Sequence, residues 1–281
     1  MSFDKLIRTY SRPIDPVSSS ISRRGVLETA IKAVLFDVYG TLFISEAGDI
    51  GVAKQCAEQN IAGIARLLDK YDVNIAPHVL FEELFREIES GKKRLINHGI
   101  NYPEIRIEEI WEKVLGIKDM DRIKSFAVEY ELIINPVYPM PHLEEMLKGC
   151  RGEGIPMGII SNAQFYTPSL FTSLLGSNPA SLGFVDNLVL FSYALGYGKP
   201  SLDIFEEAAG RLEKMGIARE AVLYVGNDML KDIFPAMTTG FQTALFAGDG
   251  RSLNLREDDT RCNEVSPDIV VTDLLQILEY V

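Results

Sequence analysis

The fold class is decided by Ile31-Lys32-Ala33-Val34-Leu35-Phe36-Asp37, a short apolar run that ends in an acid and is followed by Gly40-Thr41. A strand with both faces buried has this composition, as in a parallel sheet that helices cover on each side. An isolated amphipathic strand would instead alternate between apolar and polar residues. The segment therefore predicts the first strand of an α/β core.

Apolar runs of similar length follow much later in the chain, and stretches with helical period separate them. The later runs are Pro156–Ile160, Leu188–Phe191, Ala221–Val225, Thr243–Phe246 and, as a sixth strand, Ile269–Val271; the helical stretches include Gln164–Leu175 and Ser201–Met215. Strands that alternate with helices favour a parallel sheet. We therefore predict an α/β fold with a Rossmann-like parallel sheet and helices on both of its faces.

The interval 46–137 breaks this alternation. Its apolar residues recur three and four positions apart, which is typical of helices, and the pattern ends at Asn135-Pro136. We predict an all-helical cap over residues 46–137, inserted into a core formed by residues 31–45 and 138–281. Residues 1–30, interrupted by Pro13, Pro16 and a run of serines, are interpreted as an N-terminal extension.

Composition and charge exclude several classes of function. The formal net charge is −12, so phosphate backbones and anionic lipid would repel the chain, and the short Lys92-Lys93-Arg94 run is interpreted as a solvated helix end. The sequence predicts no nucleic-acid partner and no membrane partner. Its three widely spaced cysteines suggest neither a zinc site nor a disulfide scaffold, and no apolar run approaches a membrane span, so a cytoplasmic location is expected.

Polar residues end several of the predicted strands. Asp37 ends the first, Ser161-Asn162 the second and Asn227-Asp228 the fourth, while Lys199 lies in the loop after the third. Ligands of open parallel sheets bind outside the carboxyl ends of the strands. A nucleophile, hydrogen-bond donors and a countercharge are thus predicted at one edge, which is what anion chemistry requires. The polar loop around Arg251 and Arg256 is interpreted as plain surface.

These residues resemble the four motifs of the haloacid dehalogenase superfamily. Asp37-Val38-Tyr39-Gly40-Thr41 is similar to the first motif, DxDGT, and Ile160-Ser161-Asn162 to the second, in which Ser or Thr closes a strand. Lys199-Pro200 matches the third motif, and the stretch from Gly226 to Asp232 resembles the fourth, GDxxxxD. All four occur in the expected order and spacing, and they cover the chain apart from the cap and the N-terminal extension.

The resemblance implies a role for each residue. Asp37 would attack a small-molecule substrate to form a covalent aspartyl intermediate, Ser161 and Asn162 would bind the transferring group, and Lys199 would offset negative charge. Mg²⁺ would be held by the Asp37 carboxylate, the backbone carbonyl of Tyr39 and an acid of the fourth motif, Asp228 or Asp232. Tyr39 would also line the substrate site. The resemblance makes a homodimer an expectation.

This sequence departs from the motifs at two places, and the two departures favour different functions. Tyr39 stands where phosphatases have the acid that protonates the leaving alcohol, and a phenol with a pKa near 10 is a poor base. Tyrosine at this position is the form found in 2-haloacid dehalogenases, whose halide leaves without a proton. Asp228 and Asp232 favour a metal-using site instead, although Asn227 occupies the place of the family's first metal-binding Asp.

We therefore expect Mg²⁺-dependent hydrolysis of a small phosphorylated substrate, because a dianion beside Asp37 requires an intervening cation. One alternative is a metal-independent 2-haloacid dehalogenase. The other is a non-catalytic protein that binds a ligand or partner through the cap.

Overall fold

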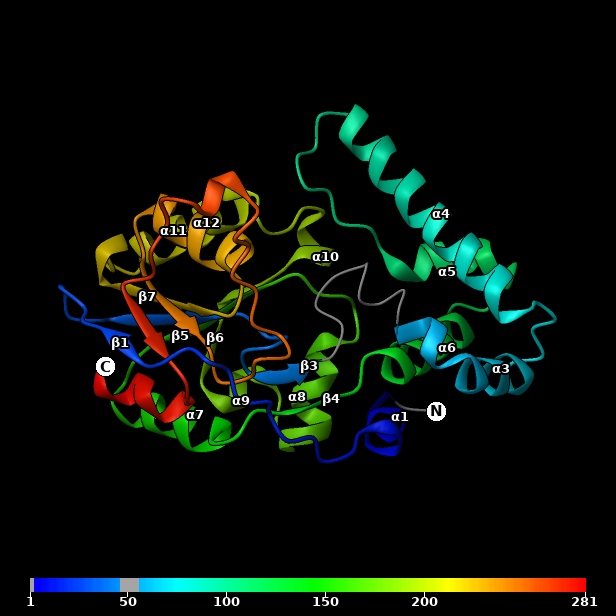
Figure 1. Cartoon of the computed structure of the whole chain (residues 1–281), viewed down its shortest axis with the longest axis horizontal. Helices are drawn as coiled ribbons and strands as arrows, with labels where there is room; N and C mark the ends of the chain where they lie inside the picture. The colour runs from blue at the N-terminus through cyan, green and yellow to red at the C-terminus, as the bar shows by residue number, and fades with distance from the viewer. Residues whose placement is uncertain (1–2, 46–55) are drawn as a thin grey trace.

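The computed structural model describes residues 3–45 and 56–281, and a seven-stranded sheet forms the centre of this part of the chain (Figure 1). The strand order is β1-β9-β8-β7-β2-β5-β6. All neighbouring strands are parallel except β1, which pairs antiparallel with β9. The predicted α/β fold with a parallel sheet is confirmed. The strands are β1 Arg24–Gly25, β2 Ala33–Phe36, β5 Met157–Ser161, β6 Phe184–Phe191, β7 Val222–Gly226, β8 Gln242–Phe246 and β9 Ile269–Val271.

Helices cover both faces of the sheet because β2 is apolar on both sides. Val34 and Phe36 belong to a hydrophobic cluster that includes residues of α7 (Leu143–Gly152) and α8 (Thr167–Leu175). Ala33 and Leu35, which point the other way, belong to a second cluster with α11 (Leu202–Lys214) and α12 (Phe234–Thr239). Figure 1 shows these two helix pairs on opposite sides of the sheet. Short helical segments complete the core: α9 Pro179–Leu182, α10 Ser192–Leu195, η1 Arg219–Ala221, η2 Met229–Ile233, η3 Thr260–Cys262 and η4 Leu274–Glu279.

The edge strand β6 begins at Phe184 rather than at the predicted Leu188. Asp186 and Asn187 are exposed on this strand and interrupt its apolar run, so the sequence pattern shows only the second half. The other predicted strands agree with the structure to within one residue at each end, except that β2 begins at Ala33, two residues after Ile31. The predicted helix at residues 201–215 is α11, where the Ser201 side chain accepts a hydrogen bond from the Asp203 N–H as an N-cap.

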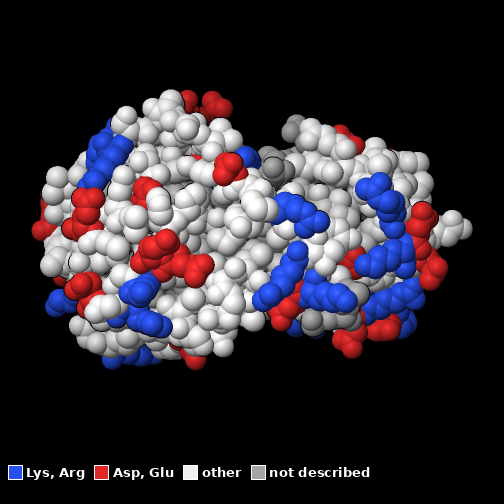
Figure 2. Space-filling model, turned by 90° about the horizontal axis from the view of Figure 1, so that it is seen from below, with Lys and Arg blue, Asp and Glu red and all other residues white. Residues whose placement is uncertain are grey.

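A separate layer is formed by four helices, α3 (Ile61–Lys70), α4 (Pro77–Asn97), α5 (Ile107–Leu115) and α6 (Met120–Ile134). We call α3–α6 the helical layer; it forms the smaller of the two lobes in Figures 1 and 2. It has its own hydrophobic cluster, in which the ring of Trp111 lies 4.9 Å from that of Phe126 and 4.7 Å from that of Tyr130. The first ten residues of the predicted cap, 46–55, lie outside the described residues.

Two short strands that the sequence did not predict lie at the base of the helical layer. They are β3 (Phe43–Ser45) and β4 (Val137–Pro139), which pair antiparallel where the chain leaves the core and returns to it. Three-residue strands leave no detectable periodicity in the sequence. Across the described ranges, no helix combines the length and the apolar composition needed to cross a membrane.

Part of the N-terminal extension packs against both lobes. Helix α1 (Phe3–Tyr10) buries Leu6 and Ile7 in the cluster that also contains residues of α6 and α8. The Tyr10 hydroxyl donates a 2.7 Å hydrogen bond to Glu129 of α6, a buried carboxylate that Lys70 and Tyr71 of the helical layer also contact. Helix α1 therefore links the core to the helical layer.

We expect Ile7→Ala to destabilise the protein by about 2–5 kcal/mol, because it leaves a cavity between α1, α6 and α8. Val26→Ala is the matched control in the same extension: Val26 is 80% exposed, so its loss should change stability by less than about 0.5 kcal/mol. Urea unfolding of both variants measures the difference. Equal stabilities would show that α1 does not contribute to the core.

Candidate active site

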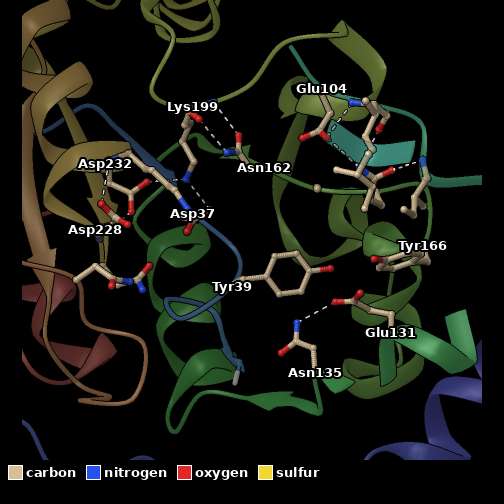
Figure 3. A pocket seen from close by; sticks show the side chains of 18 of the residues that line it. Asp37, Tyr39, Glu104, Glu131, Asn135, Asn162, Tyr166, Lys199, Asp228 and Asp232 are labelled. Atoms are coloured by element: carbon tan, nitrogen blue, oxygen red, sulfur yellow. Dashed lines mark hydrogen bonds and ion pairs between the residues drawn. The ribbon is translucent and has the colours of Figure 1, made fainter. Parts of the chain in front are cut away.

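The carboxyl ends of three adjacent strands face a cavity of about 490 Å³ (Figure 3). Asp37 follows β2, Asn162 follows β5, and Asn227-Asp228 follow β7; all four residues line the cavity. Phe36 is level with Ile159 on one side and with Val225 on the other, so the three strands end within two residues of one another along the sheet. The register of the sheet thus brings together the residues that the sequence predicted at one edge.

Lys199 holds the centre of the site. Its ammonium lies 2.7 Å from Asp37 Oδ1 and 2.6 Å from Asp232 Oδ1, and it also donates to the Tyr224 hydroxyl at 3.2 Å. Its side chain is only 2% exposed. An ammonium has three N–H donors, and these three contacts use all of them. The site is therefore a buried group of one cation and two carboxylates.

The charges in this group shift the pKa values of Lys199 and Asp232. Burial alone would lower the pKa of Lys199, but the negative charges of Asp232 and Asp37 raise it above its ordinary value, so the lysine stays charged. Burial raises the pKa of Asp232, and the charges of Asp37 and Asp228 raise it further, while Lys199 opposes the shift. One cation does not neutralise the carboxylates that surround it.

Asn162 fixes the backbone of Lys199. Its side-chain oxygen accepts from the Lys199 N–H at 2.7 Å, and its amide nitrogen donates to the Lys199 carbonyl at 3.0 Å. Ser161, the other predicted ligand of the transferring group, is fully buried at the end of β5, and its hydroxyl lies 3.5 Å from the carbonyl oxygen of Asn162. Asn162 lines the cavity and Ser161 does not.

The two acids of the fourth motif lie in different environments. Asp232 Oδ2 accepts from the Asp228 N–H at 3.0 Å, and its Oδ1 accepts from Lys199 and from Tyr224. Asp228 caps the following helical turn through the N–H groups of Leu230 and Lys231, and Arg256 Nε lies 3.1 Å from both of its carboxylate oxygens. The interpretation of Arg256 as plain surface was wrong, because the loop that carries it folds back onto the site.

Tyr39 lines the cavity next to Asp37, and its hydroxyl lies 2.8 Å from the Thr167 hydroxyl. Burial raises the pKa of Tyr39 far above its ordinary value, and the charges of Glu131 and Asp37 add to the shift. The phenol therefore keeps its proton at every physiological pH. It cannot act as the base that an aspartate at this position would be.

The helical layer closes the cavity from the opposite side. Lys92 of α4, Glu104 before α5, and Glu131 of α6 line it, and the adjoining Gln164 belongs to the core. Gln164 joins the two lobes: its side-chain nitrogen donates to the Ile105 carbonyl at 3.0 Å, and its oxygen accepts from the Ile107 N–H at 3.1 Å. The two glutamates, Tyr224 and the cavity position of Lys92 were not predicted from the sequence.

A buried lysine between strand-end carboxylates, on a parallel sheet with a helical layer above it, is an arrangement suited to an enzyme site that binds an anionic group. The haloacid dehalogenase-like hydrolase family matches residues 31–235, and a HAD-hydrolase-like family matches residues 196–277. The chain belongs to the haloacid dehalogenase-like hydrolases.

Individual relatives extend the match over most of the chain. A glyceraldehyde 3-phosphate phosphatase of Methanocaldococcus jannaschii is 26% identical over 89% of this chain and 97% of the relative, and that of Methanothermobacter thermautotrophicus is 28% identical over 76% and 85%. The fold is similar to that of a 2-haloacid dehalogenase from Pseudomonas syringae (TM-score 0.53, 21% identity, 89% of this chain and 97% of that chain). It is equally similar to that of a HAD phosphatase from Thermococcus onnurineus (TM-score 0.53, 17% identity, 89% and 97%).

Gly226 allows Asp232 to reach Lys199, because a Cβ at this position would lie 2.3 Å from Asp232 Cγ. We expect Gly226→Ala to displace Asp232, to destabilise the fold by about 1–3 kcal/mol and to reduce activity at least tenfold, an order-of-magnitude estimate. Gly210→Ala in α11 is the control, since its Cβ would meet no atom within 4 Å and should stabilise the helix by up to about 1 kcal/mol. Thermal unfolding and turnover of both variants test this, and a fully active Gly226→Ala enzyme would contradict it.

Proposed function

We propose that the protein is a phosphatase that hydrolyses small phosphate monoesters with Asp37 as the nucleophile. The observation that carries the proposal is the buried ammonium of Lys199, 2.7 Å from the Asp37 carboxylate at the wall of the cavity. A positive charge at this point holds the carboxylate of the nucleophile in place and offsets the charge of an incoming phosphoryl group. The glyceraldehyde 3-phosphate phosphatases among the relatives support the same chemistry.

In the first step an Asp37 oxygen forms a bond to phosphorus while the ester P–O bond breaks, and the alcohol oxygen leaves with the bonding electrons. Water then attacks the phosphorus of the aspartyl phosphate, the bond from phosphorus to the Asp37 oxygen breaks, and inorganic phosphate leaves as the carboxylate is restored. Solvent carries the proton that the attacking water loses and that the alcohol oxygen gains. Lys199 holds Asp37 in place through both steps, and Asp232 and Tyr224 hold Lys199. The fixed geometry of this group reduces the reorganisation that each step requires.

Tyr39 determines which leaving groups react easily. Because its pKa is raised, the phenol is a very weak acid and gives little help to a departing alkoxide. An aryl phosphate releases a stabilised phenolate that needs no proton in the transition state. We therefore infer a strong dependence of the rate on the pKa of the leaving group.

The residues at the strand ends also fit a hard divalent cation, although no three acids of the described residues converge as a metal site. Asp228 is directed toward Arg256 and Asp232 toward Lys199, so Asn227 replaces them as the third ligand in our proposal. Its side-chain nitrogen donates to the Ser252 carbonyl at 2.6 Å, and its oxygen accepts from the Thr41 hydroxyl at 3.3 Å, which fixes the amide orientation.

Asp37, the backbone carbonyl of Tyr39 and the Asn227 oxygen would then hold Mg²⁺, which suits oxygen ligands and retained water. When bound, the ion would neutralise charge between Asp37 and the phosphoryl oxygens. This countercharge matters because two unit negative charges 4 Å apart repel by about 4 kcal/mol at an effective dielectric constant near 20.

The proposal is tested by hydrolysis of p-nitrophenyl phosphate with and without Mg²⁺. We expect metal-dependent release of phosphate and a loss of at least about 1000-fold in Asp37→Asn. The carboxamide keeps the size of the carboxylate but removes its charge, so the fold is retained as circular dichroism would show. Phosphate release by Asp37→Asn at the wild-type rate would overturn the assignment of the nucleophile.

The metal ligand is tested by Asn227→Asp, which adds a carboxylate at the position where we place the ion. We expect the variant to bind Mg²⁺ at least tenfold more tightly, an order-of-magnitude figure, because an anionic oxygen replaces a neutral one. Calorimetric titration of the substrate-free protein with MgCl₂ measures the affinity without relying on turnover. Asn254→Asp is the control, since Asn254 lines the same cavity but lies outside the proposed ligand set; an equal gain there would contradict the assignment.

A second candidate function, hydrolytic dehalogenation of 2-haloacids, is favoured by Tyr39, because a halide leaves without a proton. It requires a cation for the substrate carboxylate; none of the described residues that line the cavity is an arginine, so Lys92 or Lys231 would have to supply it. Halide release from a 2-haloacid, assayed beside the phosphate ester, distinguishes the two chemistries.

A further inference from the structure

The cavity has two chemically different halves, which lie on opposite sides of Tyr39 in Figure 3. One half contains the residues at the strand ends, including Asp37 and Lys199. The other half lies against the helical layer, and Glu104 and Glu131 provide its two carboxyl groups. A phosphate ester that places its phosphorus at Asp37 must place its organic part in this second half.

Glu104 is held in a fixed position at the cavity wall. Its Oε1 accepts from the Ile105 N–H at 3.0 Å and from Gln164 at 3.1 Å, and its Oε2 accepts from the Ser192 hydroxyl at 2.8 Å. Burial raises the pKa of Glu104, while these hydrogen bonds and the charge of Lys92 counteract the shift. The carboxyl group thus remains an acceptor with a defined orientation.

Glu131 lies on the other side of the same half. Its Oε1 accepts from the Asn135 amide at 3.0 Å, and the Tyr166 hydroxyl donates to the same carboxyl group. Burial raises the pKa of Glu131. Its charge in turn contributes to the raised pKa values of Tyr39 and Tyr166, so its negative potential reaches across this part of the cavity.

The remaining side chains of this half are neutral, apart from Lys92. They include the amides of Asn135 and Gln164 and the phenol of Tyr166, with Ile88, Ile105 and Ile107 as apolar walls. Lys92 balances one of the two acids, which leaves no net positive charge for an anionic group of the substrate. Carboxyl oxygens and amides are, however, suitable partners for hydroxyl groups, which both donate and accept hydrogen bonds.

We propose that Glu104 and Glu131 form a leaving-group subsite that selects phosphate esters with an uncharged, hydroxylated organic part over esters that carry a carboxylate. The selection deepens the proposed phosphatase function and rests on it. A hydroxyl group gains a hydrogen bond to either acid, whereas a second anionic group meets like charge at both. The enzyme would thus discriminate between the two kinds of ester both by attracting a hydroxyl group and by repelling a carboxylate.

The test compares two esters with the same three-carbon skeleton, glycerol 3-phosphate and 3-phosphoglycerate. We expect kcat/KM of the wild-type enzyme to be at least tenfold higher for glycerol 3-phosphate, an order-of-magnitude estimate for like-charge repulsion. In Glu104→Gln and Glu131→Gln this ratio should fall at least about threefold, through a lower KM for 3-phosphoglycerate. Both substitutions keep the size of the side chain and an acceptor oxygen.

Glu112→Gln is the matched control. Glu112 belongs to α5 of the same helical layer, lies outside the cavity lining and pairs with Lys118, so its neutralisation should leave the ratio unchanged. Thermal unfolding of all three variants separates a structural role from selection, because loss of packing would lower stability without changing the ratio between two substrates.

Binding of the same two esters to Asp37→Asn, measured by calorimetry, gives the comparison independently of turnover. Equal affinities, or a ratio unchanged in both glutamate variants, would overturn the subsite even if the enzyme is a phosphatase. Selective binding of glycerol 3-phosphate without hydrolysis of any ester by the wild type would reject the phosphatase function and retain the subsite.

Discussion

The contact between the buried ammonium of Lys199 and the carboxylates of Asp37 and Asp232 is the constraint on which the rest of the site depends. A charge removed from water is tolerated only when its partners are close and its hydrogen bonds are complete. The three groups come from segments that are distant in sequence, so the sheet register has to bring the strand ends level. Gly226 and Asn162 serve the same requirement, one by leaving room for Asp232 and the other by holding the lysine backbone.

The ion pairs of Lys199 place a positive charge where an anion would bind, yet the carboxylates around it outnumber that charge. Lys199 is shared between two acids, and Arg256 is engaged with Asp228. This shortage of positive charge is reflected in the raised pKa of Asp232. Burial and its acidic neighbours disfavour the charged form of Asp232 despite the contact with the lysine. A phosphoryl group adds two further negative charges. The proposed phosphoryl transfer would therefore call for a cation beside Asp37, for which the Asn227 side chain and the Tyr39 carbonyl are the oxygen ligands in our proposal.

The sequence predicted Asp37, Lys199 and Asp228 because parallel strands deliver the residues that follow them to one edge of a sheet, and a strand is visible as an apolar run. Asp232, which lies beyond the end of β7, was predicted only through the resemblance to the fourth motif. Arg256 and Tyr224 could not be found in this way. Arg256 lies on a loop that reaches the site only through the tertiary fold, and Tyr224 has the apolar neighbours Leu223 and Val225 and therefore resembles an ordinary core residue. The packing of α1 was equally hidden, since Leu6 and Ile7 are too few to form a pattern. The two strands at the base of the helical layer are three residues long, below the length at which alternation is visible.

Glu104 and Glu131 show most clearly where sequence reasoning ends. Each is one of many acids in an acidic chain, and only the docking of the helical layer through Gln164 brings them into one cavity. Their importance follows from Tyr39. A site with an aspartate at that position would control its leaving group by proton transfer from the core. With a phenol there that keeps its proton, the core offers charge and the proposed nucleophile, and it distinguishes leaving groups only by their pKa. Control over the organic part of the substrate then passes to the residues opposite, which are the two glutamates.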